Sequence, residues 1–178
     1  LKRQLHIPDS ARGRARSELG LSDSAFVICS FGFLGVAKLS DRLLQGLLSS
    51  SLATDPEVVF VFAGSDAGNR SLRMQLDFAV SEASRRGGLR AQVRFTGWID
   101  SVTYRRYLEA ADGAVQLRMH SRGESSGTVL DAMAAGVPLI VNAHGSMNEL
   151  PEQTVLRLPD HCSIAQISRA LERLRSDD

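Results

Sequence analysis

The chain has 178 residues, of which 43% are hydrophobic and 23% are charged, and its formal net charge is +1. This length and composition are typical of one soluble globular domain with a proper core, and the small net charge gives no argument for binding nucleic acid. No apolar run reaches the length of a membrane span, and the basic start LKRQLHIPDSARGR lacks the apolar stretch of a signal peptide.

The two cysteines do not suggest a disulfide framework, because Cys29 lies in an apolar run typical of a core strand. A reducing, cytoplasmic compartment is therefore expected. The chain starts with Leu1 rather than Met, which we interpret as the start of a fragment of a longer protein. We expect residues 1–22 to be a lead-in segment and residues 23–178 to form the domain.

Apolar runs alternate with amphipathic stretches along the whole chain. The apolar runs predict strands at residues 25–33, 57–63, 91–96, 113–118, 137–142 and 153–158. Apolar residues at helical spacing predict helices at residues 38–53, 70–85, 101–110, 124–135 and 163–175. Nearly continuous apolar strands that alternate with helices are typical of a parallel sheet covered on both faces. The expected fold is α/β, a doubly wound parallel sheet of the Rossmann-like type.

Ligands of doubly wound sheets bind at the carboxyl ends of the strands. The segments that follow the predicted strands should therefore lie on one rim of the sheet. These segments are residues 32–38, 64–68, 97–100, 118–126 and 142–147.

Residues 122–152, RGESSGTVLDAMAAGVPLIVNAHGSMNELPE, indicate a turn, a helix, a buried strand and a second turn that starts a helix. The first turn contains Ser125, Ser126, Gly127 and Thr128. Small residues at a helix start leave backbone N–H groups bare at the positive end of the helix dipole, where phosphate binds. The same residues also suit simple helix initiation. Two glycines flank the serines, which favours a cradle for a diphosphate.

Carboxylates accompany both turns, and a carboxylate beside a phosphate site suits sugar hydroxyls. Glu124 and Asp131 lie seven residues apart and would share one helix face. Each has a structural alternative, because Ser121-Arg-Gly-Glu124 is a capping-box pattern and Asp131 suits a solvated helix face. Glu149 has the same alternative, since Ser146-Met-Asn-Glu149 is a second capping pattern.

Lys38 follows a strand end that contains glycine, FGFLGVAK. A lysine there can reach a phosphate as a point charge, although an exposed structural lysine is the alternative. A cation opposes the dipole in the first turn of a helix, which favours a functional role for this side chain; we expect it to be exposed. The stretch matches neither the P-loop pattern nor GxGxxG.

The remaining candidates are single residues on the rim. Trp98 follows a predicted strand and could either wall a base pocket or pack as a core or edge aromatic. His120 and His144 also follow predicted strands, and turn histidines are the more common interpretation. The four histidines of the chain have no metal-ligand spacing, so no metal site is expected.

Several motifs together carry a family resemblance: RSELGLSDSAFVICSFG, Lys38, VVFVFAGS, VRFTGWI, YLEAADGAVQLR and SRGESSGTVLDAMAAGVPLIVNAHGSMNELPE. They cover nearly the whole chain, which resembles the C-terminal, donor-binding domain of a retaining glycosyltransferase of family 4, one half of a GT-B fold. That family usually has two glutamates with seven residues between them, and here six residues separate Glu124 from Asp131. Phe33 replaces the arginine of the usual Gly-Arg-Leu pattern. These departures resemble a branch that includes bacterial polysaccharide mannosyltransferases.

The resemblance implies that a GDP- or UDP-linked sugar lies across the rim. The expected diphosphate ligands are Gly35, Lys38, Ser125, Ser126, Gly127 and Thr128. Glu124 would hold hydroxyls of the donor sugar and would be catalytic together with Lys38. Asp131 would hold the ribose, and Trp98 and Ile99 would border the base. The rim residues expected near the sugar are His120, Arg122, His144 and Glu149.

The resemblance also implies a reaction, the retaining transfer of a hexosyl group to a glycan or a lipid-linked acceptor without a metal or other cofactor. The acceptor site would lie in an N-terminal domain of the same protein, so the isolated chain should bind donor without turnover. Peripheral association of the full-length protein with the cytoplasmic face of a membrane is compatible with this reaction. Two alternatives stay open: a non-catalytic nucleotide-sugar-binding module, and another GT-B enzyme such as a sugar-nucleotide epimerase.

Overall fold

The computed structural model describes residues 8–66, 68–120 and 126–176. Within these residues six parallel strands form a sheet in the order β3-β2-β1-β4-β5-β6. The strands are β1 (Phe26–Phe31), β2 (Val58–Ala63), β3 (Gln92–Phe95), β4 (Gly113–Gln116), β5 (Leu139–Asn142) and β6 (Leu156–Leu158). The predicted α/β class and the doubly wound parallel sheet are confirmed.

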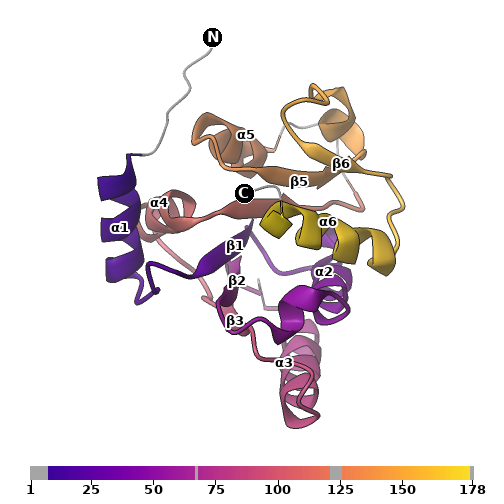
Figure 1. Cartoon of the computed structure of the whole chain (residues 1–178). Coiled ribbons are helices and arrows are strands. Elements are labelled where there is room, and N and C mark those ends of the chain that lie inside the picture. Colours follow the sequence, from indigo (N-terminus) through magenta and orange to yellow (C-terminus); the bar gives the residue numbers. More distant parts are fainter. Residues whose placement is uncertain (1–7, 67, 121–125, 177–178) are drawn as a thin grey trace.

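Helices cover both faces of the sheet (Figure 1). One face packs against α2 (Ser40–Leu48), α3 (Arg70–Arg85) and α6 (Ile164–Ser176). The other face packs against α1 (Asp9–Glu18), α4 (Ser101–Ala110) and α5 (Gly127–Ala134). Three short 3-10 helices complete the described elements: η1 (Val36–Lys38), η2 (Ser51–Thr54) and η3 (Gly145–Glu149). None of the helices in the described ranges is long and apolar enough to cross a membrane.

The strand sequences explain the two-sided core. Side chains alternate between the faces of a strand, so Phe26 and Ile28 belong to the core under α2, α3 and α6, whereas Val27 and Cys29 belong to the opposite core. All four side chains are at most 2% exposed. A strand buried on both faces needs apolar residues at every position, which is why the strands read as unbroken apolar runs.

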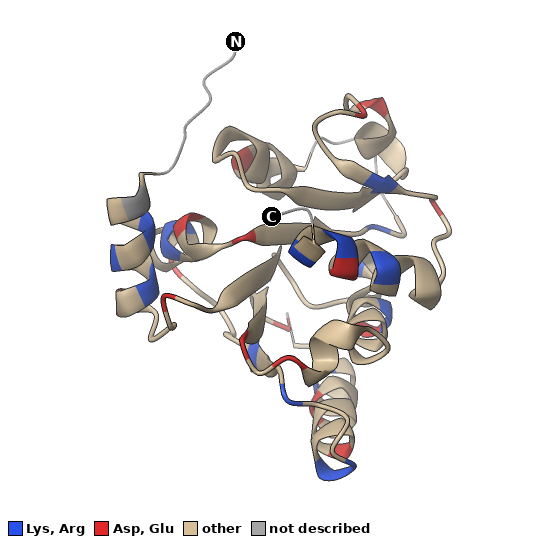
Figure 2. Ribbon diagram, viewed as in Figure 1, with Lys and Arg blue, Asp and Glu red and all other residues tan. Residues whose placement is uncertain are grey.

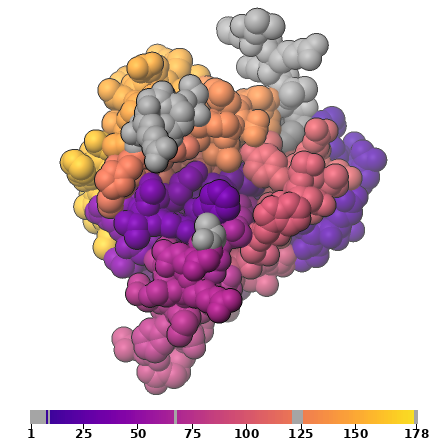
Figure 3. Space-filling view, turned by 180° about the vertical axis from the view of Figure 1, so that it is seen from behind, coloured from indigo at the N-terminus to yellow at the C-terminus, as the bar shows by residue number. Residues whose placement is uncertain are grey.

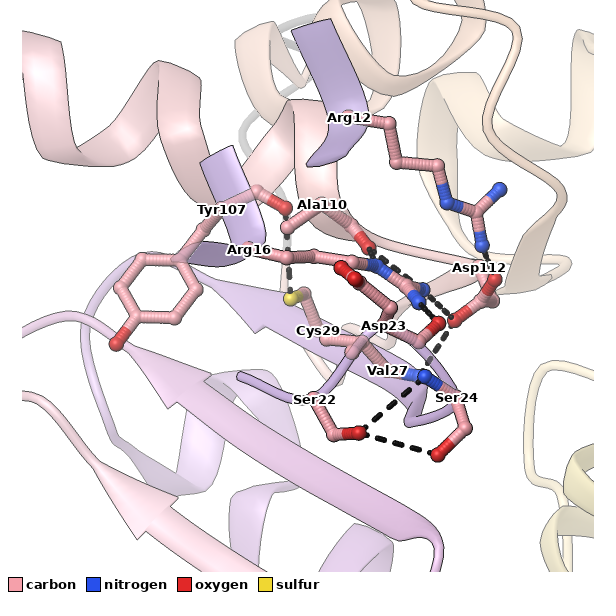
Figure 4. A network of polar contacts seen from close by, with 10 residues as sticks. All are labelled: Arg12, Arg16, Ser22, Asp23, Ser24, Val27, Cys29, Tyr107, Ala110 and Asp112. Atoms are coloured by element: carbon pink, nitrogen blue, oxygen red, sulfur yellow. Dashed lines mark hydrogen bonds and ion pairs between the residues drawn. The ribbon is translucent and has the colours of Figure 1, made fainter. Parts of the chain in front are cut away.

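The lead-in segment contains a helix that the sequence analysis did not predict. Helix α1 carries three arginines, Arg12, Arg14 and Arg16, and packs against α4 (Figure 2). Arg16 is only 4% exposed, and its guanidinium donates to the carbonyl of Ala110 at 3.3 Å and to Asp112 Oδ2 at 2.7 Å. Arg12 forms an ion pair with the other oxygen of Asp112 (Figure 4). Helix α1 is therefore anchored to the sheet by buried charge rather than by large apolar side chains.

The prediction of one continuous helix at residues 38–53 is wrong. The structure divides this stretch into the end of η1, helix α2 and helix η2. The break lies at Leu39, whose φ of 51° places it in the left-handed region that residues other than glycine seldom adopt. The buried Leu39 side chain packs in the core beside Leu43 and holds this conformation. The break turns the chain immediately after Lys38, ahead of α2.

Candidate functional site

The sheet has one topological switch point, between β1 and β4. After β1 the chain adds β2 and β3 on one side, and it then returns to add β4, β5 and β6 on the other side. The connections after β1 and β4 therefore diverge, and a crevice at the carboxyl ends of these two strands is where doubly wound folds bind ligands. Seen from behind, the purple segment that follows β1 lies centrally on this face, with the α4 region on one side (Figure 3).

Lys38 lies in this crevice, because η1 turns its side chain back toward the end of β1. Its ammonium donates to the carbonyl of Phe31 at 3.4 Å and lies over Gly32. A Cβ atom at Gly32 would be 3.2 Å from Lys38 Nζ, and the φ of Gly32 is 99°. A glycine is thus required at this strand end both by the backbone and by the approach of the ammonium. The expectation that Lys38 is exposed is wrong, since the residue is half-buried.

Burial and, to a smaller extent, the positive charge of Arg118 together lower the pKa of Lys38 to about 8. Within the described part of the chain Lys38 forms no ion pair with a carboxylate. Two cations therefore lie near each other in a partly desolvated crevice. This arrangement disfavours the charged form of Lys38. An anion that enters the crevice would stabilise the charged form again.

Arg118 was not predicted as a ligand by the sequence analysis. It follows β4, and its backbone is fixed by the fully buried Asn142, which accepts from the Arg118 N–H at 2.8 Å and donates to the Arg118 carbonyl at 2.7 Å. The guanidinium donates to Ser126 Oγ at 3.2 Å. The sequence did contain a signal for this role, because Arg118 stands at the end of a predicted buried strand, and the carboxyl ends of parallel strands lie on the rim of the sheet. We call Lys38 and Arg118 together the cationic pair.

Helix α5 starts beside the cationic pair. Ser126 is its N-cap residue and makes no side-chain cap bond; its Oγ lies 3.1 Å from Thr128 Oγ1. Gly127 has open space where a Cβ atom would be. The buried amide of Gln116 lies next to this turn, and in the orientation that satisfies both of its ends it donates to Thr128 Oγ1 at 3.2 Å and accepts from the Phe31 N–H at 2.8 Å. The structure therefore brings the predicted Ser126, Gly127 and Thr128 to the cationic pair.

A hollow of about 350 Å³ adjoins this cluster at the ends of β1, β2 and β3. Residues of four segments line it: Gly32, Phe33, Ala63, Gly64, Ser65, Trp98, Ile99, Asp100, Ser101, Tyr104 and Thr128. Phe33 is 63% exposed and Trp98 is 76% exposed, so two aromatic side chains border the hollow without partners that bury them. The predicted base neighbours Trp98 and Ile99 thus line the same hollow as Thr128. We call this feature the aromatic hollow.

Glycine permits the close approach of two strand ends at the floor of the aromatic hollow. A Cβ atom on Gly64 would lie 2.1 Å from the carbonyl oxygen of Gly32. The Gly64 N–H instead donates to Thr96 Oγ1 at 3.1 Å. The segments after β1, β2 and β3 are in this way held close together beside the hollow.

Other predicted site residues lie elsewhere or stay untested. The Gly35 N–H already donates to Ser40 Oγ at 3.2 Å, so its contact with a diphosphate stays a prediction. Asp131 does not line the aromatic hollow; its carboxylate accepts from the hydroxyl of Tyr104 at 2.8 Å. Glu124, Ser125 and Arg122 lie outside the described residues.

Three of the four rim residues expected near the sugar, His120, His144 and Glu149, belong to the described residues. His144 is held by Asp160, with Nδ1 and Oδ1 2.7 Å apart. His120 is exposed after β4, and Glu149 is exposed at the end of η3. None of the three lines the aromatic hollow, and their contacts with a sugar stay predictions.

The fold and the site define a doubly wound α/β domain with a cationic pair at its switch point. Residues 25–177 match the family described as glycosyl transferases group 1, and since this match covers most of the chain, the protein belongs to that family. No curated protein sequence matches the chain.

Solved structures share the fold. The C-terminal domain of LpcC, a group 1 glycosyl transferase from Francisella tularensis, is 21% identical with a TM-score of 0.79, over 99% of this chain and 88% of that one. HepE from Anabaena in complex with UDP-glucose is 19% identical with a TM-score of 0.77, over 98% of this chain and 45% of HepE. Sucrose-phosphate synthase from Thermosynechococcus elongatus is 22% identical with a TM-score of 0.71, over 99% of this chain and 42% of that enzyme. The chain thus has the Rossmann-like fold of GT-B glycosyltransferase domains and spans less than half of the two longer proteins.

Proposed function

We propose that this chain is the donor-binding domain of a retaining glycosyltransferase of family 4, which transfers a hexosyl group from a UDP- or GDP-linked sugar. The observation that carries the proposal is the cationic pair of Lys38 and Arg118 beside the start of α5, at the switch point of the sheet. Two cations and the N-terminal amides of a helix together favour a multiply charged anion, and a diphosphate has the required charge and length.

The same groups support catalysis as well as binding. When the bond between the sugar and the diphosphate breaks, negative charge grows on the leaving phosphate oxygen. Lys38, Arg118 and the amides of the α5 start are fixed in place before the reaction, so they stabilise this charge without reorganising. The crevice is partly shielded from water, which strengthens the stabilisation.

The aromatic hollow supports a nucleoside next to the diphosphate. Thr128 belongs to both the α5 start and the hollow, so a ligand can continue from one into the other. Trp98 and Phe33 offer exposed aromatic surface to a planar base. HepE, which shares the fold, binds UDP-glucose, and this favours a uridine nucleotide as the first candidate. Glu124 would take the hydroxyls of the donor sugar.

The proposal extends to the whole protein. An N-terminal domain of the same protein would hold the glycan or lipid-linked acceptor, at the cytoplasmic face of a membrane, and the isolated chain would bind donor without transferring it. The branch that resembles bacterial polysaccharide mannosyltransferases gives polysaccharide biosynthesis as the setting. Net transfer of sugar by the full-length protein, rather than epimerisation of the nucleotide-sugar or binding alone, would separate this reaction from the two alternatives.

A thermal-shift series tests the diphosphate site in the isolated chain. We expect UDP or GDP to raise the melting temperature, whereas uridine and guanosine have little effect, because the cationic pair contacts only the phosphates. A ligand that binds only the folded state stabilises it by about 2.7 kcal/mol at a hundredfold excess over Kd. Equal shifts with nucleoside and nucleoside diphosphate would contradict the proposal.

A second test concerns Glu124, which was predicted either to complete a capping box with Ser121 or to hold the donor sugar. Helix α5 has Ser126 as its N-cap residue, so a capping box from Ser121 to Glu124 would not start this helix. Glutamine has nearly the size of glutamate, so Glu124→Gln should leave the melting temperature of the isolated chain unchanged. A sugar hydroxyl would lose a charge-assisted acceptor, and such bonds are about twice as strong as neutral ones. In the full-length protein we expect clearly slower transfer with nucleoside diphosphate still bound. Transfer at the wild-type rate would show that Glu124 does not hold the donor sugar.

A further inference from the structure

Helix α3 presents apolar side chains to solvent on the side opposite its packed face. Leu72 and Leu76 are buried in the core, at 6% and 3% exposure. Met74 and Phe78 lie one turn apart on the other side of the helix, and they are 71% and 68% exposed. A single exposed apolar residue is ordinary on a protein surface. Two large ones side by side on one helix instead indicate a surface that another molecule covers.

The two apolar residues belong to a longer stripe on α3. Five exposed residues follow one another at intervals of four, four, three and four residues, which places them on one side of the helix. They are Arg70, Met74, Phe78, Ser81 and Arg85. We call these five residues the outer stripe. It has apolar side chains near its middle, an arginine at each end, and no acidic residue.

The acidic residues of α3 are neutralised within the helix. The carboxylate of Asp77 accepts from Arg73 Nε at 2.9 Å. Glu82 forms ion pairs with both Arg85 and Arg86, at 2.9 and 3.1 Å. The guanidinium of Arg73 also lies over the ring of Phe95 on the edge strand β3, 4.5 Å from its centroid. Both acidic side chains are thus paired with arginines and leave no unpaired negative charge beside the outer stripe.

Positive charge is concentrated in and after α3. Residues 70–90 contain five arginines and two acidic residues, a net charge of +3, whereas the whole chain has a net charge of +1. The rest of the chain is therefore net negative. Of the residues that the structure describes, none forms an ion pair with Arg70. Helix α3 extends from the body of the domain, and its tip is basic (Figures 2 and 3).

We propose that the outer stripe of α3 binds the surface of a membrane that contains anionic lipids. Met74 and Phe78 would enter the boundary between headgroups and acyl chains, and the arginines would contact lipid phosphates, as in helices that lie at a membrane interface. A protein partner fits less well, because a stable interface takes about 800 Å² from each partner and the stripe offers two apolar side chains. The inference goes beyond the proposed function and does not depend on the nucleotide site.

Co-sedimentation of the isolated chain with vesicles tests the proposal. The probes are vesicles of phosphatidylcholine alone, and vesicles of phosphatidylcholine and phosphatidylglycerol in equal amounts, at low salt. We expect the chain to bind the anionic vesicles more tightly than the neutral ones, and high salt to remove the difference by screening the arginines. Arg70→Gln should weaken binding to the anionic vesicles by about fivefold, the effect of one arginine near a charged surface, and leave binding to neutral vesicles unchanged.

The apolar contribution has its own variants. Met74→Ser combined with Phe78→Ser should weaken binding to anionic vesicles by at least about tenfold, because two apolar side chains no longer leave water. Val102→Ser is the matched control, since Val102 is 64% exposed on α4, which covers the opposite face of the sheet. This control should bind as wild type does. Circular dichroism checks that each variant is folded.

A fluorescent label locates the contact. Both native cysteines, Cys29 and Cys162, are 0% exposed, so Phe78→Cys provides one accessible thiol for an environment-sensitive dye. The emission should shift to the blue when anionic vesicles are added, and the same dye on Val102→Cys should show no shift.

Two results would overturn the proposal: wild type that does not bind anionic vesicles, or a Met74→Ser, Phe78→Ser variant that binds them as wild type does. In the second case a changed sedimentation coefficient of the variant without vesicles would identify the stripe as a protein contact. Binding of UDP and GDP is measured without vesicles, so failure of the membrane surface and failure of the nucleotide site are separate results.

Discussion

Replacing Asp112 by alanine is expected to lower the free energy of unfolding by about 3–5 kcal/mol, the cost of removing one partner of a buried ion pair. Asp112 Oδ2 accepts from Arg16 at 2.7 Å and from the Val27 N–H at 2.6 Å, and the side chains of Asp112 and Arg16 are 9% and 5% exposed. Without the carboxylate, the Arg16 guanidinium loses its counter-ion in a buried place. Urea denaturation followed by circular dichroism measures the change.

Arg12 provides the matched control for this prediction. It forms an ion pair with the same carboxylate, but its side chain is 40% exposed. Exposed ion pairs contribute about 0.2–1 kcal/mol, so Arg12→Ala should cost no more than that. An Asp112→Ala protein within 1 kcal/mol of wild type would show that Arg16 does not depend on this carboxylate, and that α1 is held in another way.

Replacing Lys38 by alanine is expected to weaken the binding of UDP or GDP by about 1.5–3 kcal/mol, the scale of a hydrogen bond to a charged group. Isothermal titration calorimetry measures this change. Folding should not suffer, because the pKa of Lys38 is lower in the folded protein, at about 8, than in the unfolded chain. A basic group with a lowered pKa opposes folding at low pH, and the penalty disappears only as pH rises through the unfolded value near 10.4.

The pH dependence of binding gives a second readout for Lys38. Below pH 8 the ammonium is mostly charged, and above it the amine is increasingly neutral. Affinity for a diphosphate should therefore fall by up to about tenfold per pH unit above pH 8, until the pKa of the complex is reached. Lys38→Ala should lack this dependence. Equal affinities for wild type and Lys38→Ala across this range would return Lys38 to a structural role.

Most of the fold could be predicted from the sequence, because strands buried on both faces leave unbroken apolar runs. Helix α1 could not be, since its buried side consists of Ala15 and the arginine Arg16 rather than large apolar residues. The break at Leu39 was also hidden, because a left-handed leucine is imposed by packing and not by local preference. The missed features are those in which tertiary contacts outweigh the local pattern.

The candidate site divides in the same way. The rim could be predicted because a parallel sheet brings all carboxyl strand ends to one edge, and this placed the segments of Lys38 and Trp98 correctly on it. The neighbours of each side chain could not be predicted. Arg118 lies near Lys38 because the side chain of Asn142, at the end of β5, forms hydrogen bonds with the Arg118 backbone after β4. The hydrogen bond from the hydroxyl of Tyr104 to Asp131 depends on how α4 and α5 are placed relative to each other.

The half-buried Lys38 also gives the protein a position for covalent labelling. At pH 8 the Lys38 amine is uncharged and nucleophilic in roughly half of the protein molecules. An ordinary lysine is uncharged in under about 1% of molecules at this pH. The chain contains only one other lysine, Lys2, and all its remaining basic side chains are arginine or histidine. An aldehyde that bears a phosphate would be drawn to the crevice by charge and would condense with this amine to an imine. Reduction of the imine with a hydride reagent would leave a stable secondary amine that links the label to Lys38.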